Sequence, residues 1–296
     1  MTLPPTRRGV HERLASLSAG APPVFNPRRT MPLRVEFVRQ LKRRRTQFAF
    51  LVLLVLPIVI ATAFKIGGQS SDGGPALVDL ASTGASNFAL FTEFASVGFL
   101  LVVIVALFCG DTVASEASWG SLRYLLAMPV PRARLLRQKL VVALTLSFGA
   151  NLVLPAWGMV VGELFFGNAA ARSPLGGTFG FDQTVWRLAV IVAYACGQSL
   201  VVAALAFLLS VTVDNPLGAV GGATLLVVVS NILDQITALD PYRRFLPTHF
   251  QYSWLDTLGQ SIVWDDMLRG TGLALIYAAV FFVIAWLRFD RKDITS

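Results

Sequence analysis

Histidine, cysteine and charged residues are all scarce in this sequence. Among 296 residues there are two histidines and two cysteines, and only 14% of the residues are charged. Cys109 and Cys196 lie inside apolar runs without a nearby histidine or second cysteine, so they predict neither a disulfide framework nor a metal site. The chain also lacks a Gly-x-x-x-x-Gly-Lys-Ser/Thr phosphate loop. We therefore expect it to bind no metal, nucleotide or other cofactor of its own.

The shortage of histidine also argues against an intramembrane enzyme, which needs a nucleophile and base, or metal ligands, at one depth. His11 lies near the N-terminus, and His249 has Asp240 and Asp256 at spacings that fit no metal-ligand template. We predict that the chain is not catalytic by itself.

Apolar residues are abundant instead. Hydrophobic residues make up 55% of the chain and the mean hydropathy is +0.64, a balance that a soluble domain could not keep without large exposed apolar patches. Long apolar runs predict six transmembrane helices, and hence an all-α integral membrane protein. The predicted spans cover residues 48–64, 88–108, 140–166, 186–210, 217–236 and 270–287.

The remaining residues complete the predicted organisation. Residues 1–30 read as a flexible cytoplasmic tail, 31–47 as an amphipathic interfacial helix, 48–288 as the six-helix transmembrane domain, and 289–296 as a cytoplasmic C-terminus. Within 31–47, Leu33, Phe37 and Leu41 recur at helical spacing among basic residues. Such a helix is expected to lie flat on an anionic lipid surface.

The net charge of +8 does not indicate nucleic-acid binding, because the basic residues cluster beside apolar runs. With the N-terminus inside and six alternating spans, 19 of the 25 Lys and Arg residues fall on the cytoplasmic side. Both termini are therefore predicted to be cytoplasmic.

The connection between the second and third spans, residues 111–139, is more than a simple loop. Leu122, Leu125 and Leu126 form an apolar face at helical spacing, which Pro129 ends, and a basic helix follows. By pattern alone, an ordinary interfacial helix is as good an explanation as a helix that contacts a soluble motor protein.

This connection resembles the cytoplasmic connection of permeases in the ABC-2 family of ATP-binding-cassette exporters. Those proteins carry a Glu, then Gly-Thr-Leu, Leu-Leu, a Pro-Val-Ser/Pro-Arg element and a Lys. The matching residues here are Glu116, Gly120, Leu122, Leu125, Leu126, Pro129, Val130, Pro131, Arg132 and Lys139. Ser121 stands where Thr is usual.

The resemblance implies a subunit of an ATP-driven exporter in the bacterial inner membrane. Two such permeases, identical or homologous, would pair, and each would dock a separate ATPase subunit that uses ATP and Mg²⁺. The residues that the resemblance assigns to ATPase coupling are Glu116, Gly120, Leu122, Arg123, Leu125, Leu126, Pro129 and Arg132. For Glu116, a purely local ion pair is the alternative.

Two further features bear on transport. The aromatic-rich segment 237–269 is expected to hold short interfacial or re-entrant helices, or else a plain aromatic belt. Polar residues inside spans are costly in lipid, which makes Asn151, Gln198 and Asn231 candidate pathway-lining residues, with Glu93 and Asp234 closer to the outer face.

Few buried charges suit an amphipathic, drug-like, peptide or lipid-like substrate. The expected partners are the ATPase, a second permease and membrane lipid, without nucleic acid. The alternatives are a secondary transporter and a membrane scaffold without transport activity.

The predicted orientation can be tested with reporter fusions. A green fluorescent protein fused after Ser296 should fluoresce, and alkaline phosphatase at the same place should be inactive, because the basic C-terminus stays in the cytoplasm. Phosphatase fused after Gly176, between the third and fourth spans, should be active. The reverse pair of activities would contradict an even number of spans with both termini inside.

Overall fold

The computed structural model describes residues 33–67, 76–120, 132–174 and 176–291. The predicted tail 1–30 and the first residues of the predicted segment 31–47 lie outside these described residues.

Six of the described helices are long and apolar enough to cross a membrane. They are α3 (Arg44–Gly67), α6 (Leu100–Ser118), α8 (Arg132–Phe166), α9 (Phe181–Thr212), α10 (Pro216–Asp234) and α11 (Asp265–Asp290). The predicted all-α membrane protein with six spanning helices is confirmed at this level. Strand structure among the described residues is limited to the antiparallel pair β1 (Ala171–Arg172) and β2 (Thr178–Phe179), between α8 and α9.

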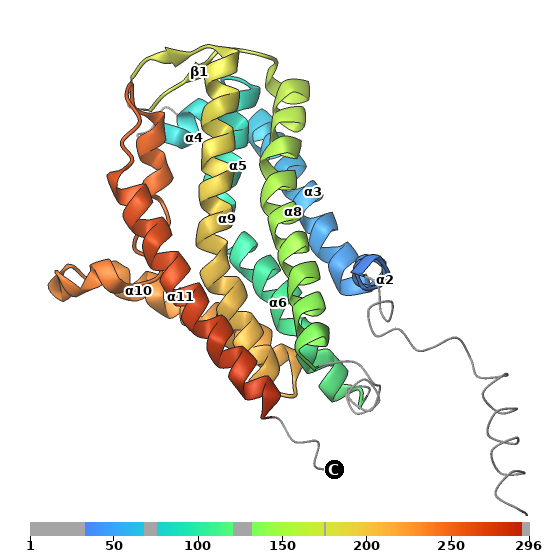
Figure 1. Cartoon of the computed structure of the whole chain (residues 1–296). Coiled ribbons are helices and arrows are strands. Elements are labelled where there is room, and N and C mark those ends of the chain that lie inside the picture. Colours follow the sequence, from blue (N-terminus) through green and yellow to red (C-terminus); the bar gives the residue numbers. More distant parts are fainter. Residues whose placement is uncertain (1–32, 68–75, 121–131, 175, 292–296) are drawn as a thin grey trace, which may run out of the picture. The chain divides into compact units, whose positions relative to one another are not determined.

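Two helices organise the packing of the unit from residue 33 onwards. Helix α9 packs against α11, α6 and α10, and α8 packs against α5 (Ala85–Val97), α6 and α3. Figure 1 shows α8 and α9 running alongside each other, with α11 crossing beside α9. Helix α10 is mostly exposed. Of its most apolar stretch of 18 residues, 22% is buried, against 78% for the corresponding stretch of α6.

The predicted second span, 88–108, is not one helix. It is divided at Gly98 and Phe99 into α5 and α6. The break leaves the Val97 carbonyl without a partner within its own helix, and the Gln251 side chain donates a hydrogen bond to it at 2.8 Å. Gly98 fits tightly there, because a Cβ atom would lie 2.5 Å from the Tyr252 hydroxyl. The contacts that stabilise this break therefore come from a segment 154 residues away in the sequence.

Helix α6 also continues further than predicted. Residues 111–118, expected to begin the cytoplasmic connection, extend the same helix to Ser118. No Gly or Pro interrupts the chain between Asp111 and Trp119, and Gly120 then adopts a left-handed conformation with φ of 68°. The acidic end of the predicted connection is thus part of the bundle.

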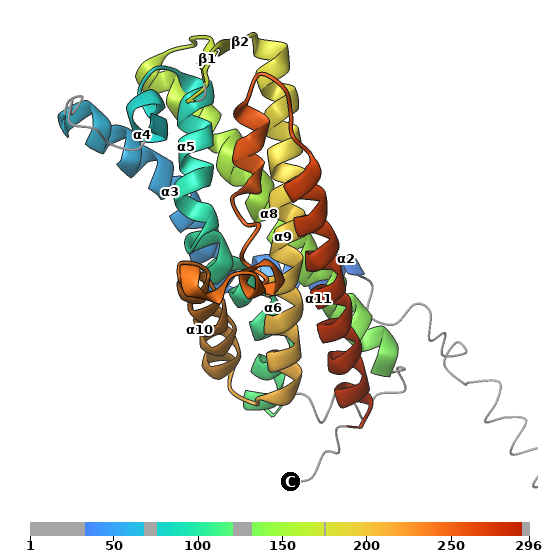
Figure 2. The same cartoon turned by 90° about the vertical axis from the view of Figure 1, so that its left-hand side faces the viewer.

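Small residues let α5 and α8 approach closely. Gly158 and Gly162 are spaced four apart on α8, and they face Ala85 and Ala89 of α5. A Cβ atom on Gly162 would lie 2.8 Å from the Ala85 Cα, so the two backbones would have to separate. Figure 2 shows α5 upright beside α8.

This contact predicts a matched pair of substitutions on one helix. Gly162→Ala should destabilise the protein by about 1–3 kcal/mol, because an added methyl group there meets backbone atoms. Gly149→Ala should be neutral or slightly stabilising, because nothing lies within 4 Å of its Cβ position. Thermal unfolding in detergent measures both, and equal midpoints for the two variants would contradict the close α5–α8 contact.

Candidate coupling site and internal cavity

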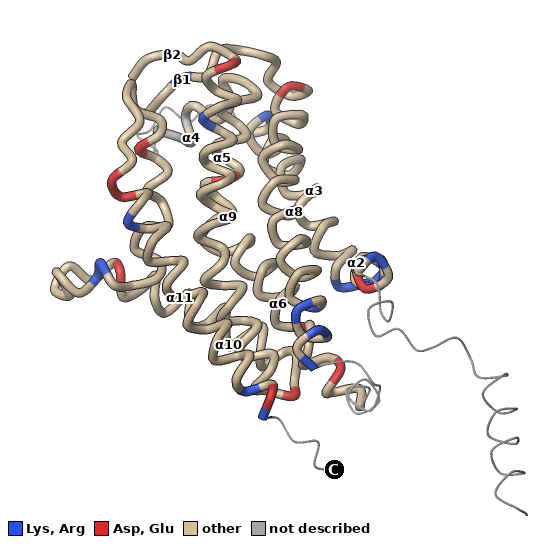
Figure 3. The backbone as a smooth tube through the Cα atoms, viewed as in Figure 1, with Lys and Arg blue, Asp and Glu red and all other residues tan. Residues whose placement is uncertain are grey.

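A partly buried group of charged side chains joins four elements at one end of α6. We call it the charge cluster; it consists of Glu36, Arg39, Arg43, Arg45, Asp111, Glu116 and Lys139. Glu36 and Arg39 belong to α2 (Leu33–Leu41), and Arg43 lies in the turn before α3. In Figure 3 charged residues gather mostly toward the helix ends, and α2 carries both signs.

Glu116 lies at the centre of the charge cluster. Its side chain is 3% exposed, and Oε1 is 2.7 Å from Arg39 Nη2 and 3.2 Å from Lys139 Nζ. Lys139 is 2% exposed and also approaches Glu36 Oε1 at 3.4 Å. A buried ammonium is tolerated only when it is paired, and here two carboxylates from different helices share it.

Asp111 is held by a second set of contacts. Arg43 Nη1 is 2.8 Å from Asp111 Oδ2, and Arg45 Nη1 is 2.5 Å from Oδ1. Arg43 also donates to the Ser115 hydroxyl and lies over the Trp119 ring, 5.4 Å from its centroid. The start of α3 is therefore bound to the last two turns of α6.

Helix α2 is oriented by these charges and not by its leucines. Leu33 and Leu41, on the face predicted to meet lipid, are 46% and 37% exposed on the protein surface, while Glu36 and Gln40 are buried. Phe37 of the same face packs against an apolar cluster of the bundle. The polar side faces inward because Lys139 and Arg39 require a carboxylate there.

The predicted coupling residues fall in two groups. Gly120 ends α6, and Arg132 begins α8, where its guanidinium donates to the Asp290 carbonyl at the end of α11, 3.2 Å away. The other members lie outside the described residues: Leu122, Arg123, Leu125, Leu126 and Pro129. Their role in coupling stays a prediction. Glu116 forms ion pairs with Arg39, Arg43 and Lys139, which lie 77, 73 and 23 residues away in the sequence, and its role in coupling also stays a prediction.

Sequence reasoning named Glu116 and Lys139 but missed their partners in α2 and before α3. One signal was available: Glu36 is the single acid in the basic segment 31–47. An isolated acid in a helix meant to bind an anionic surface indicates a specific partner for it.

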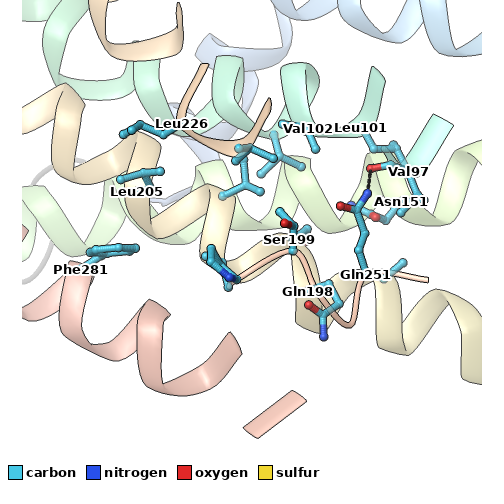
Figure 4. Close-up of a pocket in the computed structure, with 17 residues that line it drawn as sticks. Val97, Leu101, Val102, Asn151, Gln198, Ser199, Leu205, Leu226, Gln251 and Phe281 are labelled. Carbon is cyan, nitrogen blue, oxygen red and sulfur yellow. Dashed lines mark hydrogen bonds between the residues drawn. The ribbon is translucent and has the colours of Figure 1, made fainter. Parts of the chain in front are cut away.

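A partly open cavity of about 240 Å³ lies between the helices of the bundle (Figure 4). Helices α6, α8, α9, α10 and α11 line it, together with Val97 and residues 247, 248 and 251. Two of the three candidate pathway residues, Asn151 and Gln198, belong to its wall. Asn231 does not; it is half-exposed on α10.

The cavity wall carries amide side chains at one end, Ser199 and Gln198 near its middle, and apolar side chains at the other end. Figure 4 shows Asn151 and Gln251 beside Val97, with Leu205, Leu226 and Phe281 at the opposite end. An apolar space with a few convergent polar groups is the common form of a small-molecule site.

The segment after α10 forms part of this wall. It contains three 3₁₀ helices, η1 (Thr237–Leu239), η2 (Tyr242–Phe245) and η3 (Ser253–Leu258). Trp254 is completely buried among Leu90, Ile191 and Met267, which is unlike a plain aromatic belt. The Tyr194 hydroxyl donates to the Phe250 carbonyl, and Thr248 bonds Ser230 at 2.8 Å. Residues 248–258 are therefore folded into the bundle, while Tyr242 and Phe245 of η2 stay exposed.

These features define a multi-pass α-helical membrane protein with a partly buried charge cluster and an internal cavity. The chain belongs to the family described as "Protein of unknown function (DUF2705)", which it matches over residues 58–295. The match contains Asp111, Glu116 and Lys139 and begins after α2.

Two proteins of Bacillus subtilis strain 168 are similar to it. "Uncharacterized protein YhcI" is 25% identical over 226 residues, covering 72% of this chain and 68% of the relative. "Uncharacterized membrane protein YdbK" is 24% identical over 208 residues, covering 67% of this chain and 80% of the relative. The name of the second agrees with the membrane character of this chain.

The charge cluster predicts a large effect for its buried lysine. Lys139→Met should cost about 3–5 kcal/mol of stability, because it removes a cation from between two buried carboxylates. Lys42→Met, at an exposed position of the same charge, should change stability by less than about 0.5 kcal/mol.

The double variant Lys139→Met with Glu116→Gln should cost less than the sum of the two single variants, because the residues share one network. Chemical unfolding in detergent provides these values. Strict additivity would show that Lys139 and Glu116 do not interact.

Proposed function

We propose that this chain is the membrane subunit of an ATP-driven exporter of the ABC-2 type. ATP and Mg²⁺ would be used by a separate ATPase, present in two copies, and the chain would pair with a second permease, identical or homologous. The observation that supports this most is the burial of Glu116 among Arg39, Arg43 and Lys139 at the start of the segment that resembles the ABC-2 connection.

The structure suggests how such a segment would act on the bundle. Residues 121–131 join α6 to α8, and the charge cluster ties those two helices to α2 and to the start of α3. A displacement of the segment by a bound ATPase would therefore move α6 and α8 together.

The same two helices carry walls of the cavity: Leu101, Val102 and Val105 on α6, and Asn151 on α8. In this proposal Glu116 acts as a positioning residue inside the bundle, and surface contact with the ATPase is made by the residues that follow it. An amphipathic substrate would meet both the amide and the aliphatic parts of the wall.

A secondary transporter is the second candidate, and one observation favours it. The interrupted helix at Gly98 and the buried acid Glu93 one turn before Val97 are features of ion-coupled carriers. Transport that persists without ATP and stops when ion gradients are collapsed would support this reading over the exporter.

Affinity purification from the native membrane, followed by mass spectrometry, tests the exporter proposal. The wild-type chain should retain an ATPase with Walker motifs, and Arg123→Glu should retain at least about fivefold less of it, because the variant reverses a charge in the docking segment. Arg269→Glu is the matched control. The Arg269 side chain is 71% exposed at the start of α11, on the predicted outer side of the membrane, away from the docking segment.

Equal loss of the ATPase in both variants would show that Arg123 has no specific part in the contact with the ATPase. Failure to recover any ATPase from wild type, even after cross-linking, would contradict the exporter proposal itself.

A further inference from the structure

Helix α5 contains a buried acid that the coupling site does not use. Glu93 is 0% exposed, and neither of its carboxylate oxygens has a hydrogen-bond partner among the described residues. It takes part in none of the ion pairs that the described Lys and Arg residues form. A carboxylate in such surroundings is costly unless a ligand or a proton neutralises it.

Glu93 lies next to the polar end of the cavity. It precedes Val97 by one helical turn, so the two residues share a face of α5, and Val97 lines the cavity. It is also close enough to Cys196 of α9 to interact with it electrostatically, and the neighbouring Ala195 lines the cavity. Glu93 is not itself one of the lining residues, so helices α5 and α9 place its carboxyl group behind the wall, and contact with a ligand requires the side chain to turn into the cavity.

Other polar groups in this region also lack partners. Ser96 Oγ, on the same helix as Glu93, and Gln198 Nε2, in the cavity wall, are buried without a hydrogen bond among the described residues. Native bundles seldom leave several buried polar atoms unpaired in one place, and such groups indicate a missing water or ligand. Most of the other residues that line the cavity are apolar.

We propose that the cavity binds a small apolar molecule that carries a protonated amine, with the ammonium group against Glu93 and the hydrocarbon body among the aliphatic side chains of α6 and α10. A cation is favoured because an anion would be repelled by the carboxylate, and a neutral donor would leave its charge unbalanced. Side-chain oxygens of Asn151 and Gln251 at the same end could accept the other ammonium hydrogens.

The cavity volume limits the size of this ligand. About 240 Å³ lies below the range of roughly 300–1,000 Å³ that holds drug-sized molecules, so a single fused-ring amine is a suitable probe. This inference rests on the proposed function, since it names the substrate class of the exporter. Its test needs no ATPase, so the two can fail separately.

The test uses the full chain in nanodiscs and compares 1-naphthylmethylamine with 1-naphthalenemethanol, its neutral counterpart of nearly equal shape. Equilibrium dialysis at pH 7, corrected with empty nanodiscs, measures both dissociation constants. The wild type should bind the amine at least about tenfold more tightly than the alcohol, because only the amine pairs with a desolvated carboxylate.

Three variants separate the causes. Glu93→Gln should abolish the preference for the amine while it keeps binding of the alcohol. Glu163→Gln, at an exposed glutamate of α8, should leave both affinities unchanged. Ala195→Leu should weaken both ligands, because it fills the cavity without altering Glu93.

Two results would overturn the proposal. The first is an unchanged or stronger preference for the amine in Glu93→Gln, which would make Glu93 a structural residue that is neutralised by a proton. The second is wild-type binding of either probe no greater than that of empty nanodiscs or of Ala195→Leu. Neither result would alter the recovery of an ATPase in the affinity purification. That experiment therefore tests the exporter proposal independently.

Discussion

The burial of Lys139 between Glu36 and Glu116 is the constraint on which one end of this structure depends. An ammonium group that is 2% exposed cannot be left unpaired, so α2 and α6 must both present a carboxylate to α8. That requirement turns the polar side of α2 inward and leaves its leucines exposed. Arg43 and Arg45 extend the same pairing to Asp111, which brings in the start of α3.

Networks of this kind specify an arrangement more than they stabilise it, because desolvation of the charges offsets much of their attraction. Each carboxylate of the charge cluster contacts cations from at least two positions in the chain. A shift of α6 by one residue would separate several of these pairs at once. The charge cluster can therefore keep α2, α3, α6 and α8 in register near the C-terminal end of α6.

The second constraint concerns backbone groups that are not in a regular helix but lie inside the apolar bundle. They still need hydrogen-bond partners. The break at Gly98 frees the Val97 carbonyl, and the inserted Gln251 side chain donates a hydrogen bond to it. Residues 248–258 are anchored in turn by Trp254 and by the Tyr194 hydroxyl. Val97 and Gln251 both line the cavity, so the break and the inserted segment each contribute to its wall.

Much of the fold could be predicted from the sequence because it depends on local composition. Apolar runs of about 20 residues identify the six spanning helices, and the predicted third span ends at Phe166, where α8 ends. Asn151 and Gln198 stood out as polar residues in apolar helices, and both line the cavity. Polar residues are rare in membrane-spanning helices, so each one is a good candidate for a functional position. Asn231 shows that not every such residue lines the cavity.

By itself, then, the sequence determined the protein class and the number of spanning helices, and it singled out Glu116 and Lys139, which the structure places in one ion-pair network. Only the tertiary structure decided the break at Gly98, the inward polar side of α2 and the isolation of Glu93. The physical reason is that hydropathy is a sum over neighbours in the chain, whereas the pairing of a buried charge or carbonyl depends on distant residues. Gln251 and Val97 are 154 positions apart, and no local pattern connects them.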